Sequence, residues 1–229
     1  MRRRSSFTKI VVVGGGAGGM AVISALKKSN AAGRLELTLM EPSDYHYYQP
    51  QWTMVGGGMF PREASRRPTA DLIPAGVNWI NEAVAEFEPE QNSLTTVNGN
   101  TVSYDYLIVA AGMKLDWGKI EGLEGNLGKH GICSNYSYDS VESTWQNIRG
   151  MKSGNALFTF PPPPIKCAGA PQKIMYLAED HFRRSGVRNQ INVRYFCAAD
   201  GIFAVKKYAK VLNQICVDRD IETNFAWNL

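Results

Sequence analysis

The segment that most constrains this chain is a glycine-rich turn between a buried strand and a helix. The apolar run Ile10–Val13 leads directly into Gly14-Gly-Gly-Ala-Gly-Gly19. Residues 20–28 follow with apolar side chains at helical spacing and no helix breaker, and residues 35–40 form a second apolar run that ends at Glu41. This order predicts a β-α-β unit within a parallel sheet.

Each position of this motif has a physical role in holding a dinucleotide. The first glycine allows the tight turn, the second lets a pyrophosphate approach the backbone, and the third lets helix and strand pack closely. Free N–H groups at the helix start bind negative charge, and an acid after the second strand accepts hydrogen bonds from ribose hydroxyls. The cofactor-contacting residues expected in this unit are Gly14, Gly16, Ala17, Gly18, Gly19 and Glu41.

The later segments predict an α/β fold with two Rossmann-like dinucleotide-binding domains. Residues 77–102 contain short runs in which apolar and polar residues alternate, and Pro89 and Asn98-Gly99 separate these runs. This pattern predicts a small antiparallel sheet. Residues 104–112 return to a buried strand that ends at Gly112, a pattern that closes the first nucleotide domain of flavoproteins and indicates FAD. A second β-α-β pattern has expected strands at 157–160, 192–197 and 223–227 and expected helices at 171–184 and 205–219.

Three parts follow from this reading: a basic tail at 1–9, an FAD-binding domain at 10–150 and the start of a second Rossmann-like domain at 151–229. The chain has 25 basic and 21 acidic side chains, and the excess of four is confined to the first nine residues. A nucleic-acid-binding protein would spread such charge over a face or a helix, so no nucleic-acid partner is expected.

The turn after the strand at 157–160 differs from a nucleotide-binding loop. Pro161-Pro-Pro-Pro164 stands where a nicotinamide-binding domain has glycines, and prolines lack the N–H groups that hold phosphate, so NAD(P)H is disfavoured. Cys167 follows Lys166 and precedes a predicted helix start at Pro171, and both the cation and the helix terminus favour a thiolate. Cys167 is therefore the candidate reactive residue.

The remaining metal-binding and nucleophilic side chains predict structural roles. Cys133, Cys197 and Cys216 have apolar neighbours and form no C-x-x-C pair, so no metal site is expected. His181 lies on an apolar helical stripe with Ile174, Leu177, Ala178 and Phe182, which is expected to face a sheet.

Several segments together resemble the sulfide:quinone oxidoreductase family, in particular its mitochondrial branch. They are the glycine motif, Glu41-Pro42, Tyr47–Trp52, Arg67–Thr69, residues 106–112, 134–137 and 158–161, and, most specifically, Lys166-Cys-Ala-Gly-Ala-Pro-Gln-Lys-Ile-Met-Tyr176. The resemblance implies a flavoenzyme of the mitochondrial inner membrane that oxidises hydrogen sulfide, holds the sulfur as a persulfide on Cys167, and passes electrons through FAD to a quinone. A small thiol or sulfite then takes the sulfur. It also implies flavin contacts at Gln49 and Val84.

The same resemblance implies that this chain is the first half of such an enzyme. The second redox cysteine and the helices that hold the enzyme on the membrane surface belong to the later half of the family. Two alternatives stay open at this stage. One is a flavoenzyme like the type II NADH:quinone reductases, which share the first domain, and the other is a truncated, non-catalytic FAD-binding protein.

Overall fold

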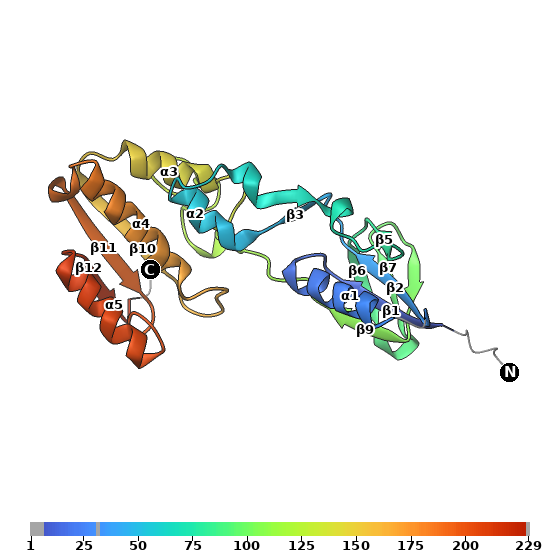
Figure 1. Ribbon diagram of the computed structural model, residues 1–229. Helices are drawn as coiled ribbons and strands as arrows, with labels where there is room; N and C mark the ends of the chain where they lie inside the picture. Colours follow the sequence, from blue (N-terminus) through green and yellow to red (C-terminus); the bar gives the residue numbers. More distant parts are fainter. Residues whose placement is uncertain (1–6, 31–32, 228–229) are drawn as a thin grey trace. The chain divides into compact units, whose positions relative to one another are not determined.

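The computed structural model describes residues 7–30 and 33–227, and the chain forms two compact units (Figure 1). The first unit comprises Met1–Tyr48 and Glu63–Leu115, and the second comprises Gln49–Arg62 and Asp116–Leu229. Most of the predicted basic tail, residues 1–6, lies outside the described residues, and β1 begins at Thr8.

The first unit is built on a four-stranded parallel sheet with the order β5-β2-β1-β9. Its strands are β1 (Thr8–Val13), β2 (Leu35–Met40), β5 (Asn78–Ile80) and β9 (Tyr106–Val109), and α1 (Ala17–Ser29) connects β1 to β2. Alternate side chains of β1 point to opposite faces of the sheet, so each face has its own core. Ile10 and Val12 pack with Ile23 of α1, whereas Val11 and Val13 pack with Leu94 of a second, smaller sheet.

That smaller sheet confirms the antiparallel sheet predicted within residues 77–102, except for its first strand. It consists of β6 (Val84–Glu88), β7 (Ser93–Thr96) and β8 (Thr101–Ser103), and all its pairs are antiparallel. The prediction was wrong for residues 77–80, because β5 instead pairs parallel to β2 in the main sheet. The backbone N–H of Glu41 donates to the carbonyl of Ile80, and this long-range contact decides the pairing of so short a strand.

A short antiparallel pair completes the first unit. It joins β3 (Tyr45–Tyr47) to β4 (Arg66–Pro68), with His46 opposite Arg67. The pair lies in the chain just beyond Glu41. It therefore fixes the backbone that follows the end of β2.

The second unit has a three-stranded parallel sheet with the order β10-β11-β12. Its strands are β10 (Gly154–Phe160), β11 (Ile191–Cys197) and β12 (Glu222–Phe225), and its helices are α2 (Trp52–Gly56), α3 (Val141–Gly150), α4 (Ala170–Arg184) and α5 (Lys206–Asp218). These elements confirm the second β-α-β pattern to within a few residues at each end. Figure 1 shows α4 and α5 beside the sheet.

Helix α4 buries only part of its predicted stripe against the sheet. Ile174, Ala178 and Phe182 lie in the core, but Leu177 contacts the position where Gly57 would carry a Cβ. The half-buried His181 ring packs edge-to-face on Trp145 of α3, with 4.9 Å between ring centroids. Burial, with nearby Arg184 and Lys152, lowers the pKa of His181.

Because α2 and α3 pack with α4, contacts join residues 49–62 and 116–150 to the second sheet. The predicted domains at 10–150 and 151–229 were drawn from ligand motifs instead. They stay a prediction about which part of the chain holds the cofactor.

Candidate nucleotide site and reactive cysteine

The glycine turn between β1 and α1 has the close contacts that its sequence predicts. Gly14 adopts a φ of +99°, in the left-handed region that favours glycine, and a Cβ there would overlap the carbonyl oxygen of Ala110. A Cβ on Gly19 would overlap the carbonyl oxygen of Gly14, so any side chain would separate helix from strand. By contrast, a Cβ on Gly16 would meet no atom within 4 Å. The turn is thus closed on the protein side and open at Gly16.

The start of α1 fits the pyrophosphate of a dinucleotide such as FAD. Gly16 caps the helix without a side-chain hydrogen bond, and the first turn holds no acidic residue. Gly16, Ala17 and Gly18 are exposed, so an anion can reach the backbone N–H groups there. These are the positions that the sequence predicts for cofactor contacts.

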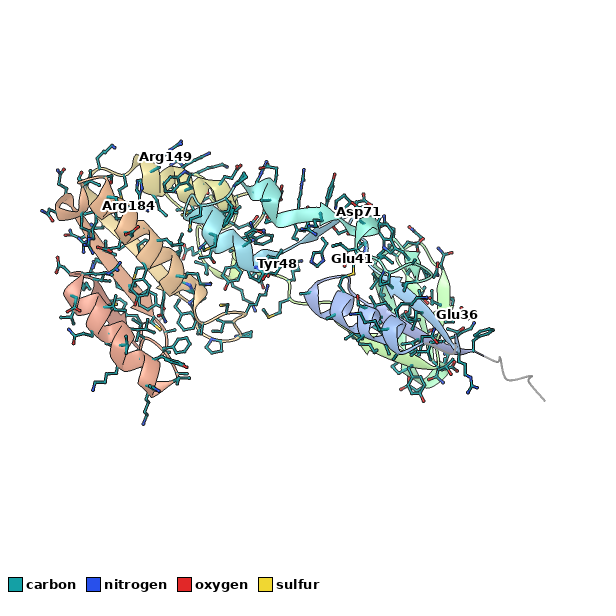
Figure 2. The ribbon with its side chains drawn as sticks, in the orientation of Figure 1. Glu36, Glu41, Tyr48, Asp71, Arg149 and Arg184 are labelled. Atoms are coloured by element: carbon teal, nitrogen blue, oxygen red, sulfur yellow. The ribbon has the colours of Figure 1, made fainter. Side chains whose placement is uncertain are left out.

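Glu41 directly follows β2 (Figure 2), and several hydrogen bonds fix it there. Its Oε2 atom accepts from the backbone N–H of Gly15 at 2.6 Å, and Oε1 accepts from the backbone N–H of Ser43 at 2.8 Å. The indole N–H of Trp79 donates to the Glu41 carbonyl at 2.9 Å. Each carboxylate oxygen can accept more than one hydrogen bond, so this oriented carboxylate can still bind ribose hydroxyls.

His46 is a neighbour of this site that the sequence analysis missed. Its Nδ1 atom lies 2.9 Å from the carbonyl oxygen of Gly15, whose N–H contacts Glu41. The two residues are 31 positions apart in the chain, so no local sequence pattern predicts this contact. Only the pairing of β3 with β4 brings His46 to the glycine turn.

The other predicted flavin contacts are distributed over both units. Val84 begins β6 at an irregularity in the pairing with β7, and Gly112 follows β9 with a φ of +75° and open space around it. Both belong to the first unit, together with the glycine turn. Gln49 begins a short 3₁₀ turn (Gln49–Gln51) in the second unit.

Cys167 lies exposed in the loop that connects β10 to α4. Its sulfur is 4.0 Å from the position where Gly169, the residue that caps α4, would carry a Cβ. The Tyr136 hydroxyl donates to the Cys167 carbonyl at 3.5 Å. Partial burial lowers the pKa of Lys166, the residue that precedes Cys167. The loop thus presents a reachable sulfur beside a cation and a helix start.

The three other cysteines are less accessible. Cys197 and Cys216 are buried, Cys133 is half-buried, and all four cysteines are free. Burial raises the pKa of the Cys197 and Cys216 thiols. The Tyr176 hydroxyl lies 3.5 Å from the Cys216 sulfur, within the core of the second unit. Cys167 is therefore the cysteine most open to a dissolved reactant.

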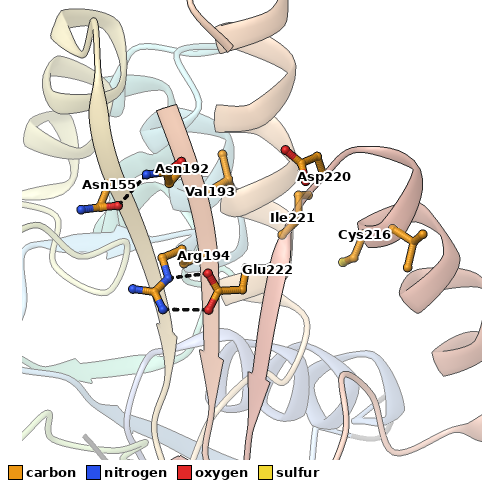
Figure 3. A pocket seen from close by; sticks show the side chains of 9 residues that line it. Asn155, Asn192, Val193, Arg194, Cys216, Asp220, Ile221 and Glu222 are labelled. Atoms are coloured by element: carbon orange, nitrogen blue, oxygen red, sulfur yellow. Dashed lines mark hydrogen bonds and ion pairs between the residues drawn. The ribbon is translucent and has the colours of Figure 1, made fainter. Parts of the chain in front are cut away.

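A hollow of about 620 Å³ lies in the second unit, and the buried Cys216 is part of its lining (Figure 3). The lining also includes Asn155, Asn192 and Arg194 at the start of the sheet, together with Val193, Val217, Asp220, Ile221 and Glu222. The ion pair between Arg194 and Glu222, 2.7 Å long, spans two of its strands. Nucleotides bind at the carboxyl ends of parallel strands, so this hollow is a poor candidate for the cofactor site.

Within residues 7–30 and 33–227, none of the helices is long and apolar enough to cross a membrane. The same part of the chain holds no group of three or more His, Cys, Asp or Glu side chains that could bind a metal ion.

The fold and the glycine site define the class of protein. The chain belongs to the pyridine nucleotide-disulphide oxidoreductase family, whose model matches residues 8–147. This membership confirms the predicted α/β fold class and supports FAD as the cofactor.

More specific similarity is to sulfide:quinone oxidoreductases, as the sequence predicts. The chain is 45% identical over 229 residues to the mitochondrial sulfide:quinone oxidoreductase of Dictyostelium discoideum, covering 100% of this chain and 50% of the relative. For the mitochondrial enzyme of Mus musculus the identity is 47% over 221 residues, covering 96% and 49%. The solved sulfide:quinone oxidoreductase of Aquifex aeolicus matches with a TM-score of 0.83 at 23% identity, over 97% of this chain and 52% of that chain.

The lengths of these matches bear on function. The chain spans about half the length of the curated relatives it matches. A type II NADH:quinone oxidoreductase of Staphylococcus aureus is 25% identical over 117 residues, which cover 51% of this chain. The similarity to the NADH-linked class is therefore weaker and shorter.

Proposed function

We propose that this chain forms the FAD-binding and sulfide-reacting half of a mitochondrial sulfide:quinone oxidoreductase. The observation that carries the proposal is the 45% identity to such an enzyme over the whole chain, which includes the loop of Cys167. The exposed sulfur at the start of α4 supports it. In this proposal residues 10–150 hold the cofactor, and residues 151–229 begin the domain that carries the redox cysteine.

The glycine turn and Glu41 would hold the adenine dinucleotide part of FAD. The N–H groups at the start of α1 would bind the pyrophosphate, and the Glu41 carboxylate would accept from the ribose. We add Gln49, Val84 and Gly112 as further flavin contacts. When bound, FAD supplies a group that accepts two electrons and releases them to a quinone.

Cys167 would react with sulfide as one member of a disulfide. HS⁻ attacks the Cys167 sulfur, the disulfide bond breaks, and the partner cysteine leaves as a thiolate with the electron pair. Cys167 then carries the new S–S bond as a persulfide, and the two electrons taken from sulfide remain with the partner thiolate, for which a bound FAD would be the two-electron acceptor. The Lys166 cation and the start of α4 lie beside this sulfur.

The partner of Cys167 is proposed to lie in the half of the relatives that this chain does not span. Cys197 and Cys216 are buried, so neither can meet an exposed sulfur without unfolding. A small thiol or sulfite would accept the persulfide sulfur. The inner mitochondrial membrane would supply the quinone, as the relatives' mitochondrial names suggest.

The Pro161–Pro164 segment argues against the NADH-linked alternative. All four prolines are exposed, and their missing N–H groups leave little with which to bind a nucleotide phosphate. A non-catalytic FAD-binding protein is the outcome to distinguish by experiment.

The test is the absorbance spectrum, before and after sulfide is added, of a longer protein in which this chain is followed by a second half that carries the partner cysteine. We expect a bound flavin whose spectrum changes with sulfide, by bleaching or by a long-wavelength charge-transfer band, and which NADH leaves unchanged. Cys167→Ser is expected to abolish the response to sulfide, and Cys133→Ser to preserve it. A flavin that ignores sulfide would favour the non-catalytic alternative, and bleaching by NADH would favour the NADH-linked class.

A further inference from the structure

The peptide groups around Gly15 are held from two sides by side chains. Glu41 Oε2 accepts from the Gly15 N–H at 2.6 Å, and His46 Nδ1 lies 2.9 Å from the Gly15 carbonyl oxygen. A carbonyl oxygen only accepts, so the His46 ring must carry a proton on Nδ1. All three residues belong to the first unit.

This contact fixes the direction of a neighbouring donor. The carbonyl of Gly15 and the N–H of Gly16 belong to one peptide group, which is trans, so the two point in opposite directions. When His46 holds the carbonyl, the Gly16 N–H is turned away from the imidazole. Gly16 is exposed and has open space where a Cβ would stand. The N–H is therefore available to a ligand at the start of α1.

The segment that carries His46 is itself firmly braced. The Thr69 hydroxyl donates to the Ser43 carbonyl at 2.9 Å, and the Asn81 side chain donates to Asp44 at 2.7 Å. Arg66 stacks on the Tyr45 ring, with its guanidinium carbon 4.5 Å from the centroid. These contacts hold the backbone beside His46 in place before any ligand arrives, which lowers the entropy cost of ordering the site.

We propose that His46 is a positioning residue for the dinucleotide pyrophosphate. Its Nδ1–H holds the Gly15 carbonyl and so aims the Gly16 N–H at the phosphate oxygens, while Glu41 holds the other side of Gly15. The proposal rests on the FAD-binding function proposed above and deepens it. His46 acts through the backbone and touches no reacting atom.

The test compares ligand affinities of the 229-residue chain and its variants. His46→Phe keeps the ring but removes the donor, and we expect it to weaken FAD binding about tenfold, which corresponds to ~1.4 kcal/mol. His46→Asn places an amide N–H near the former Nδ1 position and is expected to restore most of the affinity. His130→Asn, at an exposed loop histidine of the second unit, is the control and should bind FAD normally.

Competition by ADP and by adenosine separates positioning from general stability. Of these two ligands only ADP carries a pyrophosphate. His46→Phe should therefore weaken the binding of ADP and leave the binding of adenosine unchanged. An equal loss for both ligands, or no loss for FAD, would overturn the role of His46. Heteronuclear NMR of the imidazole adds an independent readout, since a ring protonated only at Nε2 would contradict the contact. Failure of the unsubstituted chain to bind FAD would instead overturn the proposed function.

Discussion

Replacement of Glu179 by glutamine should destabilise the second unit strongly. The Glu179 side chain is 1% exposed, and its Oε2 lies 2.9 Å from Arg219 Nη1. Its Oε1 lies 3.5 Å from Arg188 Nε and 3.9 Å from Arg183 Nε. The carboxylate thus joins α4 to the segments on both sides of β11, and Glu179→Gln removes its charge while keeping its shape.

The expected cost follows from these exposures and distances. At an effective dielectric constant of about 20, charges 2.9 Å apart attract by roughly 6 kcal/mol before desolvation is subtracted. Removal of one partner from a buried pair costs about 3–5 kcal/mol. Arg219 is 34% exposed, and Arg188 keeps the carbonyls of Ile191, Arg219 and Asp220 as acceptors. We therefore expect Glu179→Gln to lower the free energy of unfolding by about 3 kcal/mol, the low end of that range.

Thermal unfolding followed by circular dichroism measures this effect. For a chain of this size 1 kcal/mol shifts Tm by about 2–4 °C, so the expected fall is roughly 6–12 °C. Asp180→Asn is the matched control, because the neighbouring Asp180–Arg184 pair is exposed and worth less than about 0.5 kcal/mol. Equal melting temperatures for the two variants would refute the assignment of Glu179 as the buried anchor.

Three further outcomes are expected. Gly19→Ala should eliminate bound FAD and lower the free energy of unfolding by about 1–3 kcal/mol, because its Cβ would overlap the Gly14 carbonyl oxygen. A normal FAD content of this variant would contradict this expectation. The folded-state pKa of His181 lies below its ordinary value, so the unfolded chain binds the proton more readily and stability should fall as pH drops below about 6.5. Tm measured against pH should lose that slope in His181→Phe, and an unchanged slope would exclude His181. Peptide mass spectrometry after brief alkylation of the native chain should find Cys167 modified and the buried thiols Cys197 and Cys216 protected; early modification of either buried thiol would argue against the core described here.

The elements of both parallel sheets could be predicted from the sequence because their signals are local. The apolar run before Gly14 and the helix that follows depend on residues a few positions apart, and β2 ends before Glu41 as predicted. The strand at 78–80 could not be placed in this way. A three-residue run fits either a parallel or an antiparallel partner, and only its contact with Glu41 resolves the choice.

The sequence by itself determined the class of fold, because the glycine motif stands between an apolar strand and a helix and is followed by a second strand that ends at Glu41. Glycine permits the positive φ at Gly14 and the close approach of α1 at Gly19. The segment from Lys166 to Tyr176 likewise indicated the similarity to sulfide:quinone oxidoreductases from sequence alone. The tertiary structure decided which side chains surround the motif. Gly15 contacts Glu41 and His46 across separations of 26 and 31 residues, and such contacts depend on sheet pairing, which no local pattern encodes.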